Sequence, residues 1–365
     1  MSEAEKKLNA LRREIDALDS ELLALINRRA GLAKKVAAVK GGDTGAQYYR
    51  PEREAEVLRT LLEGNDGPLS GKHISRIFRE IMSACLALQK PLAVAYLGPA
   101  GTFTESAAFK HFGHAIDSQP MDGIGAVFRR VQSGGSEFGV VPIENSTEGV
   151  IGHTLDSFVS SGLFICAEVE LRIHHCLMAS GGGLEDIEKI YSHQQSFAQC
   201  RGWLDANLPK AARETVSSNG EAARRASAEA GSAAIAGEIA AADYGLPVLA
   251  ANIEDEAENT TRFVVIGRRE VGRTGSDKTS LLFSTRDRSG ALYELLHAFK
   301  ARDINMTRIE SRPSRRAKWS YLFYVDIEGH VQDANVMAAL AELEQQAPFY
   351  KFLGSYPQSS TRTAE

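Results

Sequence analysis

The sequence lacks several features that mark specialised classes of protein. It contains no apolar run near the roughly 20 residues that span a membrane, and it begins with the polar stretch MSEAEKKLNALRREID rather than with a secretion signal. We therefore expect a cytoplasmic protein without a membrane partner. It also has no basic stripe interleaved with aromatic residues, so we expect no nucleic-acid partner.

Metal-ligating side chains are sparse and poorly spaced. The four cysteines do not have the close spacing of a metal site, which favours reduced thiols at Cys85, Cys166, Cys176 and Cys200. His174, His175 and His193 have no acidic or thiol partner at ligand spacing. Hydrogen-bonded structural histidines are the favoured interpretation, and we expect no metal and no cofactor.

Three different patterns follow one another along the 365 residues, whose composition is otherwise that of an ordinary globular protein. Residues 1–91 are helical in pattern. Residues 92–272 alternate short apolar strands with helices, which predicts an α/β domain of two lobes with a cleft between them. Residues 273–365 follow the order β-α-β-β-α-β, which predicts a ferredoxin-like α+β domain.

The first helix carries a long apolar seam. Ten positions follow steps of three and four, and nine of them are apolar: Leu8, Leu11, Ile15, Leu18, Leu22, Leu25, Arg29, Leu32, Val36 and Val39. Such a helix is too long for one small domain to cover, so we infer an intertwined dimer. The alternative is a plain coiled-coil stalk. The Arg29 guanidinium argues for an anionic partner, because an unpaired charge in a seam is costly.

Other cations flank the same seam. Arg12 and Lys40 are about 42 Å apart at the helical rise, so one small ligand does not touch both in one chain. In an antiparallel dimer, Arg12 of one chain meets Arg29 and Lys40 of the other. A second helix begins near Pro51, and a third runs from about residue 72 to 89. Together they predict a cationic pocket for a small dianion.

This segment resembles the all-helical chorismate mutases through ALRREIDALDSELLALINRR, YYRPERE and CLALQ. The resemblance implies that Arg12, Arg29 and Arg53 hold the two substrate carboxylates. It places Lys40 and Gln89 at the breaking ether oxygen and Glu54 at the ring hydroxyl. The reaction is a single rearrangement without nucleophile or metal, so holding the substrate and stabilising charge on one oxygen are sufficient.

Polar caps recur in the middle segment. Four strand-to-helix turns pair a small polar residue with Glu or Gln three positions later, at Thr102/Glu105, Asn145/Glu148, Ser192/Gln195 and Ser218/Glu221. If these helix starts line one cleft, their N–H groups form an anion site. The alternative is that each cap only stabilises its own helix.

The same segment resembles the prephenate dehydratases through YLGPAGTFTESA, VVPIENSTEGV, YSHQQSFAQC and NTTRFVVIG. The resemblance implies a fold like that of periplasmic binding proteins, with Thr261, Arg262 and Phe263 as a signature at the cleft. Glu144, Asn145, Ser146, Thr147 and Thr104 are expected to join them. Thr261 is expected to donate to the leaving hydroxyl with Glu144 in support, while Arg262 and helix N-termini anchor the pyruvyl carboxylate.

The last segment has no concentrated set of catalytic groups, which favours regulation. It resembles the amino-acid-binding ACT domains of the phenylalanine-sensing kind, through Gly290, Ala291 and Leu292 and through Glu310, Ser311 and Arg312. The resemblance implies phenylalanine binding at a dimer interface. The alternative is a dimerisation domain without an effector.

Taken together, these resemblances predict a bifunctional enzyme that converts chorismate to prephenate and prephenate to phenylpyruvate. It is expected to be at least a dimer and to be inhibited by phenylalanine. Two competing hypotheses are a non-enzymatic amino-acid sensor and a dehydratase whose helical segment only dimerises.

Overall fold

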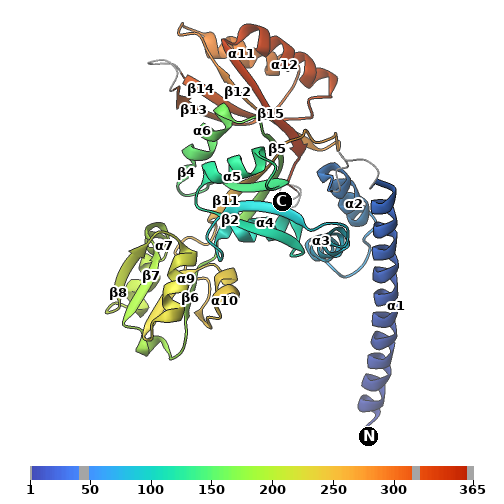
Figure 1. The fold of residues 1–365 in the computed structure, drawn as a ribbon, viewed down its shortest axis with the longest axis vertical. Helices are drawn as coiled ribbons and strands as arrows, with labels where there is room; N and C mark the ends of the chain where they lie inside the picture. The colour runs from blue at the N-terminus through green and yellow to red at the C-terminus, as the bar shows by residue number, and fades with distance from the viewer. Residues whose placement is uncertain (1, 41–48, 315–320, 360–365) are drawn as a thin grey trace.

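The computed structural model describes residues 2–40, 49–314 and 321–359, which form three parts in chain order (Figure 1). The first part is helical, the second consists of two α/β lobes, and the third packs two helices on one sheet. None of the described helices combines the length and apolar character needed to cross a bilayer.

The first part contains three helices, α1 (Glu3–Lys40), α2 (Pro51–Glu63) and α3 (Gly71–Ala87). Pro51 opens α2, a position where its missing N–H is not needed. Ser70 caps α3 by accepting from the backbone N–H of His73. The predicted all-helical segment is confirmed.

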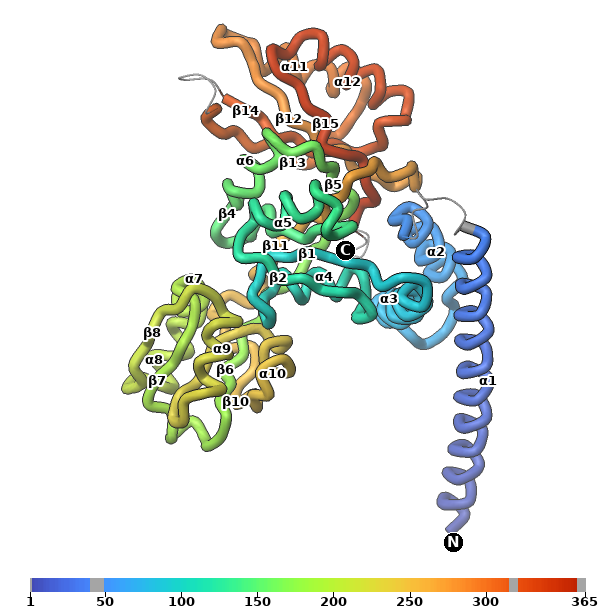
Figure 2. The backbone as a smooth tube through the Cα atoms, viewed as in Figure 1, coloured from blue at the N-terminus to red at the C-terminus, as the bar shows by residue number. Residues whose placement is uncertain are grey.

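Helix α1 projects away from the other elements along most of its length (Figures 1 and 2). It contacts α3, yet its seam is largely open to solvent: Leu11, Leu18 and Leu25 are each more than half exposed. A continuous apolar face in water costs free energy. One chain alone therefore leaves this helix without a cover.

The first lobe of the middle part has a six-stranded sheet in the order β2-β1-β3-β11-β5, with β4 paired to β3. Its strands are β1 (Leu92–Leu97), β2 (Ile116–Met121), β3 (Phe138–Asn145), β4 (Gly149–Val150), β5 (Phe164–Arg172) and β11 (Thr260–Gly267). Strands β1, β2 and β3 are parallel, whereas β11 lies antiparallel between β3 and β5. The helices of this lobe are α4 (Phe103–Phe112), α5 (Ile124–Gln132) and α6 (Gly152–Ser160).

The second lobe has a five-stranded sheet in the order β10-β6-β9-β7-β8. Its strands are β6 (Cys176–Ala179), β7 (Lys189–His193), β8 (Ala212–Val216), β9 (Ser232–Ala236) and β10 (Val248–Ala250). Its helices are η1 (Leu184–Asp186), α7 (Gln194–Gln199), α8 (Arg201–Asn207), α9 (Asn219–Ala228) and α10 (Glu238–Tyr244). The chain enters this lobe after β5 and returns to the first lobe at β11, so the two predicted lobes are confirmed.

The third part has a four-stranded antiparallel sheet in the order β13-β14-β12-β15. Its elements are β12 (Asp277–Ser284), α11 (Ala291–Lys300), β13 (Met306–Pro313), β14 (Tyr321–Glu328), α12 (Ala334–Gln346) and β15 (Phe349–Pro357). The predicted β-α-β-β-α-β order is confirmed. Strand β13 lies at the edge of the sheet and pairs with β14.

The third part shares a buried core with the first lobe. Tyr324 and Leu353 belong to the same apolar cluster as Leu155 and Ile165. The Tyr324 hydroxyl also donates to the backbone oxygen of Leu155 at 2.7 Å. The two parts are therefore packed against each other through side chains rather than joined by a free linker.

Candidate active site

A hydrogen-bonded cluster forms where β3 ends and β11 begins. Asn145 and Thr261 are register partners in the antiparallel β3–β11 pair. The Asn145 Nδ2 donates to Thr261 Oγ1 at 2.8 Å and to Asn259 Oδ1 at 2.8 Å. Asn145, Asn259 and Thr261 are all buried. The fold thus brings together two segments separated by more than 110 residues in the chain.

The orientation of the Asn145 amide is determined by its surroundings. Its Oδ1 accepts from the Thr147 N–H at 3.1 Å, the Thr147 hydroxyl at 2.7 Å and the Glu148 N–H at 3.1 Å. The NH₂ group must therefore face Thr261, and Thr261 Oγ1 accepts from it. In the parts of the chain that are described, the Thr261 hydroxyl donates to no acceptor. Its hydrogen is available to an incoming ligand.

Ser146 and Asn259 extend the cluster. The Ser146 hydroxyl accepts from the Thr260 N–H at 2.9 Å and donates to Asn259 Oδ1 at 3.5 Å. Asn259 Oδ1 accepts from both Asn145 and Ser146, so the Asn259 NH₂ group points away from them. That buried nitrogen has no hydrogen-bond partner among the described residues. An unpaired buried donor is uncommon, which makes the Asn259 NH₂ group a candidate contact for a ligand.

The loop that follows β1 in the first lobe packs against the second lobe. The Tyr244 hydroxyl donates to the Ala100 oxygen at 3.2 Å, and the Phe103 ring meets the His175 ring edge-on at 5.4 Å. Thr104, one of the predicted site residues, is buried in the first turn of α4. One of the strand-to-helix turns that the sequence singles out, the turn between β1 and α4, therefore contributes to the contact between the lobes.

Of the four helix caps predicted from the sequence, the structure confirms one, at Ser218. Ser218 caps α9 as expected by accepting from the Glu221 N–H at 3.1 Å. Ser192 does not cap α7; that N-cap is His193, which accepts from Gln195. Asn145 is followed by a tight turn and β4 rather than by a helix, so its expected role as a helix cap is wrong.

Thr102 stands at the N-cap of α4, but its hydroxyl donates to the Leu97 oxygen at 3.1 Å instead of accepting from the helix. Glu105 accepts from the Tyr96 hydroxyl and from the Gly101 N–H, both at 2.7 Å. Burial raises the pKa of this carboxyl. The expected reciprocal capping box at this helix is therefore wrong, because both side chains bond to the preceding strand and loop.

Arg262 and Glu144 lie on the opposite face of the sheet from Thr261 and Asn145. The Arg262 Nη1 is 2.9 Å from Asp326 Oδ2 and 3.4 Å from Glu168 Oε2, and its Nη2 is 3.2 Å from Glu144 Oε2. Successive residues of a strand point to opposite faces. The structure therefore does not bring Arg262 or Glu144 to the Thr261 side chain, contrary to the expectation from the sequence. Phe263 is buried in the apolar core of the first lobe.

The three histidines considered as ligands each have a hydrogen-bond partner. His174 Nδ1 is 2.7 Å from Glu254, and His175 Nε2 is 2.8 Å from Gln199. His193 accepts at the start of α7. Among the described residues, no group of three or more His, Cys, Asp or Glu side chains has the geometry of a metal site.

The helical part places several predicted side chains near the α2–α3 pair. Glu54 is close to Arg79, with 3.1 Å between Oε1 and Nε, and burial raises the pKa of the Glu54 carboxyl. Arg53 is exposed and pairs with Glu56 at 2.5 Å, and Gln89 lies half-buried in the turn after α3. The side chain of Lys40 lies outside the described residues.

Arg12 and Arg29 both lie on α1, Arg12 exposed and Arg29 half-buried. Because α1 is one uninterrupted helix, Arg12 stays about 25 Å from Arg29 within one chain. One chain therefore does not bring all the predicted mutase residues to one place.

The predicted effector motifs occupy two different elements of the third part. Gly290 caps α11 at a φ of 77°, a left-handed conformation that favours glycine, and it is followed by Ala291 and Leu292. Glu310, Ser311 and Arg312 lie on the edge strand β13. Their part in binding an effector stays a prediction.

Comparison with known families covers nearly the whole chain. Residues 11–90 match the family described as chorismate mutase type II, residues 94–271 match prephenate dehydratase, and residues 279–345 match the ACT domain. The bifunctional chorismate mutase/prephenate dehydratase of Stutzerimonas stutzeri is 53% identical over 364 residues, covering 98% of this chain and 100% of the relative. The enzyme of the same name from Escherichia coli K12 is 33% identical, covering 98% of both chains.

The chain belongs to the bifunctional chorismate mutase/prephenate dehydratases. It is an enzyme with a mutase part and a dehydratase part, followed by an ACT domain. The confirmed order of parts agrees with the order predicted from the sequence.

Solved structures resemble the dehydratase and ACT parts together. The prephenate dehydratase of Arthrobacter aurescens in complex with L-Phe has a TM-score of 0.67 and 37% identity, covering 73% of this chain and 90% of that one. The dehydratase of Staphylococcus aureus has a TM-score of 0.63 and 28% identity, covering 73% and 100%. A chain described as a quorum quenching acylase, GqqA, has a TM-score of 0.68 and 29% identity, covering 74% and 99%.

Asn259 is the residue of the Asn145–Thr261 cluster that is missing from the site predicted from the sequence. It lies two positions before Thr261, so the period of a strand places it on the same side as Thr261. That spacing was the available signal, and the quoted motif NTTRFVVIG already contains the residue. Arg79 of the mutase part was missed as well, because its partner Glu54 is 25 positions away in the chain.

We expect Asn259→Ala to lower dehydratase kcat/KM at least about tenfold, since the Asn145 NH₂ group loses one of its two buried acceptors. Asn259→Asp keeps an acceptor oxygen but loses the NH₂ donor, so an equal loss would identify the donor as a substrate contact. Prephenate is supplied directly and phenylpyruvate is measured, with mutase activity as the control for folding. Full dehydratase activity in Asn259→Ala would contradict this role.

Proposed function

We propose that this enzyme converts chorismate to prephenate in its helical part and prephenate to phenylpyruvate at the Asn145–Thr261 cluster, with phenylalanine as a feedback inhibitor. The observation that supports the proposal is the Thr261 hydroxyl in the matched dehydratase part, which donates to no acceptor within residues 2–40, 49–314 and 321–359. We assign the mutase to residues 1–91, the dehydratase to 92–272 and the ACT regulatory domain to 273–365, in a cytoplasmic protein.

The dehydratase reaction needs a donor at the leaving group. The bond to the ring carboxylate breaks, its electron pair enters the ring, and the ring hydroxyl leaves as water after taking up one proton. Negative charge grows on the departing oxygen, where the Thr261 hydroxyl donates and stabilises it. Asn145 supports this role by donating to Thr261 Oγ1 at 2.8 Å, which offsets charge developing on that oxygen.

The pyruvyl carboxylate remains in the product and needs its own anchor. Arg262 was expected to supply it, but its guanidinium is engaged by Asp326, Glu168 and Glu144. Among the predicted anchors, this leaves the N–H groups of helix starts, the turn residues Ser146 and Thr147, and Thr104 in the first turn of α4. Holding the departing carboxylate less tightly favours its loss as carbon dioxide.

Thr261→Val is expected to lower dehydratase kcat at least about a hundredfold, because valine has the shape of threonine without the donor. Thr261→Ser retains the hydroxyl and should keep much of the activity. Turnover is followed as phenylpyruvate formed from prephenate, while mutase activity shows whether the chain is folded. Undiminished turnover in Thr261→Val would refute the assignment.

For the mutase, we propose that Arg29 and Arg53 of one chain and Arg12 of a second chain hold the two carboxylates of chorismate. Lys40 and Gln89 donate to the ether oxygen, and Glu54 contacts the ring hydroxyl. The uncovered seam of α1 supports a second copy as the partner, because another copy presents the same apolar face. The enzyme is therefore at least a homodimer in this proposal.

Lys40→Ala is expected to reduce mutase kcat/KM at least about a hundredfold, as loss of one charged donor at a developing oxyanion does. Lys35→Ala, at an exposed lysine of the same helix, is the matched control. Both variants should convert prephenate at the normal rate. A fully active Lys40→Ala mutase would exclude this role for Lys40.

A shared site also predicts complementation between inactive chains. Arg12→Ala and Lys40→Ala each inactivate both sites of a homodimer, but a mixed dimer keeps one site with both residues intact. Co-expressed chains should regain about a quarter of wild-type mutase activity, since half of randomly formed dimers are mixed and half of their sites are intact. No recovery in purified mixed dimers would refute a site shared between chains.

For regulation, we propose that phenylalanine binds the ACT domain through Gly290, Ala291 and Leu292 and through Glu310, Ser311 and Arg312. The family match over residues 279–345 supports this, as does the L-Phe complex of the A. aurescens dehydratase. Inhibition requires that phenylalanine bind a less active state more tightly.

The decisive experiment supplies purified protein with chorismate and follows chorismate, prephenate and phenylpyruvate with and without phenylalanine. Conversion through to phenylpyruvate, reduced by phenylalanine, is the expected result. Accumulation of prephenate would overturn the dehydratase assignment. If chorismate is not consumed but added prephenate is converted, the protein is a dehydratase whose helical segment only dimerises. If neither chorismate nor prephenate is converted, the result favours a non-enzymatic amino-acid sensor.

A further inference from the structure

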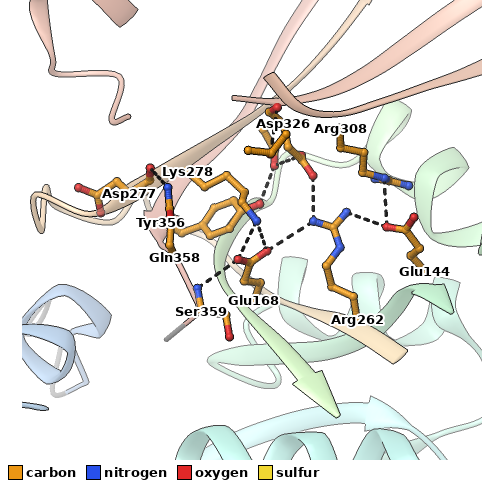
Figure 3. Close-up of polar contacts among 12 residues, drawn as sticks. Glu144, Glu168, Arg262, Asp277, Lys278, Arg308, Asp326, Tyr356, Gln358 and Ser359 are labelled. Carbon is orange, nitrogen blue, oxygen red and sulfur yellow. Dashed lines mark hydrogen bonds and ion pairs between the residues drawn. The ribbon is translucent and has the colours of Figure 1, made fainter. Parts of the chain in front are cut away.

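A buried network of charged side chains joins the dehydratase part to the ACT domain (Figure 3). The dehydratase part contributes two carboxylates and a guanidinium, and the ACT domain contributes two cations and a carboxylate. The members are Glu144 on β3, Glu168 on β5, Arg262 on β11, Lys278 on β12, Arg308 on β13 and Asp326 on β14.

Three links of this network cross the boundary between the two parts. Arg262 Nη1 lies 2.9 Å from Asp326 Oδ2. Lys278 Nζ donates to both oxygens of Glu168 at 2.7 Å. Arg308 Nε lies 3.2 Å from Glu144 Oε2, the same oxygen that Arg262 Nη2 approaches at 3.2 Å.

The charges balance only when the two parts are together. The dehydratase members carry a formal charge of −1 and the ACT members +1, and all of the side chains except Glu144 are at most 12% exposed. A buried charge that loses its partner is strongly unfavourable. The network therefore holds the two sheets in one relative position, in addition to the shared apolar core.

Asp326 is oriented and ionised within this network. The Ser280 hydroxyl donates to Asp326 Oδ1 at 2.5 Å. Burial alone would raise the pKa of Asp326, but the guanidinium groups of Arg262 and Arg308 hold it below its ordinary value. Asp326 thus presents a fixed negative charge to Arg262.

The network connects directly to the backbone of the dehydratase site. Arg262 and Glu144 are register partners, and so are their neighbours Thr261 and Asn145 on the opposite face. A shift of Arg262 or Glu144 therefore moves the adjacent Thr261 or Asn145 through a single peptide unit. A bulge in the β3–β11 pair follows Arg262, which interrupts the regular ladder at this point.

The strand that carries Arg308 also carries the predicted effector motif. Arg308, Glu310 and Arg312 lie at every second position of β13, so their side chains point to the same face of the strand. Arg312 approaches the dehydratase part as well, with 3.8 Å between its Nε and Asp156 Oδ1 on α6. Movement of this edge strand would therefore act on the network directly.

We propose that Asp326 and Arg308 of the ACT domain are positioning residues for the dehydratase site. They hold Arg262 and Glu144, and through them the Asn145–Thr261 hydrogen bond, and effector binding at β13 alters turnover by disturbing these contacts. This inference rests on the proposed dehydratase site at Thr261.

The test compares full-length Asp326→Asn and Arg308→Gln with Glu328→Gln, an exposed acid on the same strand as Asp326. Dehydratase kcat and KM, the phenylalanine concentration for half-inhibition and mutase activity are measured for each. We expect both network variants to lower dehydratase kcat at least about fivefold and to shift half-inhibition at least about fivefold, with mutase activity unchanged. Glu328→Gln should match the wild type.

Wild-type kinetics and inhibition in both network variants would overturn the proposal. An equal loss of mutase and dehydratase activity would also overturn it, because that pattern indicates general damage. A lower dehydratase kcat with unchanged phenylalanine inhibition would support positioning and overturn the effector route.

Two further measurements separate the network from folding and from the active-site assignment. If Asp326→Asn does not fold, a double-mutant cycle with Glu144→Gln and Arg308→Gln replaces it. The factor by which kcat falls in the double variant should be smaller than the product of the factors in the two single variants. A factor equal to that product would overturn the Glu144–Arg308 link. An active Thr261→Val would remove the proposed site itself. An inactive Thr261→Val beside unaffected network variants would remove the network proposal alone.

Discussion

The alternation of side chains along β11 is the constraint on which the arrangement of the dehydratase part depends. This strand returns from the second lobe and inserts antiparallel between β3 and β5 of the first. Thr261 then faces Asn145, while Arg262, one residue later, faces the carboxylates on the other side of the sheet. One strand thus serves the candidate site on one face and the ACT interface on the other.

The two faces of β11 use different chemistry because their surroundings differ. On the site face, uncharged amides and hydroxyls form an oriented chain that ends at Thr261, whose hydroxyl donates to none of the described residues. On the interface face, full charges are buried and must be matched by partners from the ACT domain. Among the described residues, the Thr261 hydroxyl donates to no acceptor, whereas the Arg262 guanidinium is paired with Asp326.

The helical part is related to the other two in a different way. It contacts the dehydratase part through α3 and α4, where the Ala115 N–H donates to the Ser83 hydroxyl at 3.2 Å, yet most of α1 extends into solvent. The dehydratase and ACT parts share a buried apolar core within one chain. The apolar seam of α1, in contrast, is largely exposed in one chain, and Arg12 stays about 25 Å from Arg29 along that helix.

Local patterns in the sequence were enough to predict the class and order of all three parts. The heptad seam, the strand–helix alternation and the β-α-β-β-α-β order each depend on near neighbours in the chain, and motif resemblance added the two activities. Asn145 is one of the site residues that the sequence predicts, but its neighbours in space could not be predicted from chain order alone. Whether it caps a helix or orients Thr261 depends on a strand more than 110 residues away.

The roles of Arg262 and Glu144 were decided by tertiary structure alone. A motif lists adjacent residues together, but a strand separates them onto two faces, and the partner Asp326 comes from another domain. Even so, the alternation of side chains can be predicted from the sequence. Applied to NTTRFVVIG, it places Thr261 and Arg262 on opposite faces and places Asn259 on the same face as Thr261. What the sequence determined was the periodicity of each element; which face meets a ligand and which meets a neighbouring domain followed only from long-range packing.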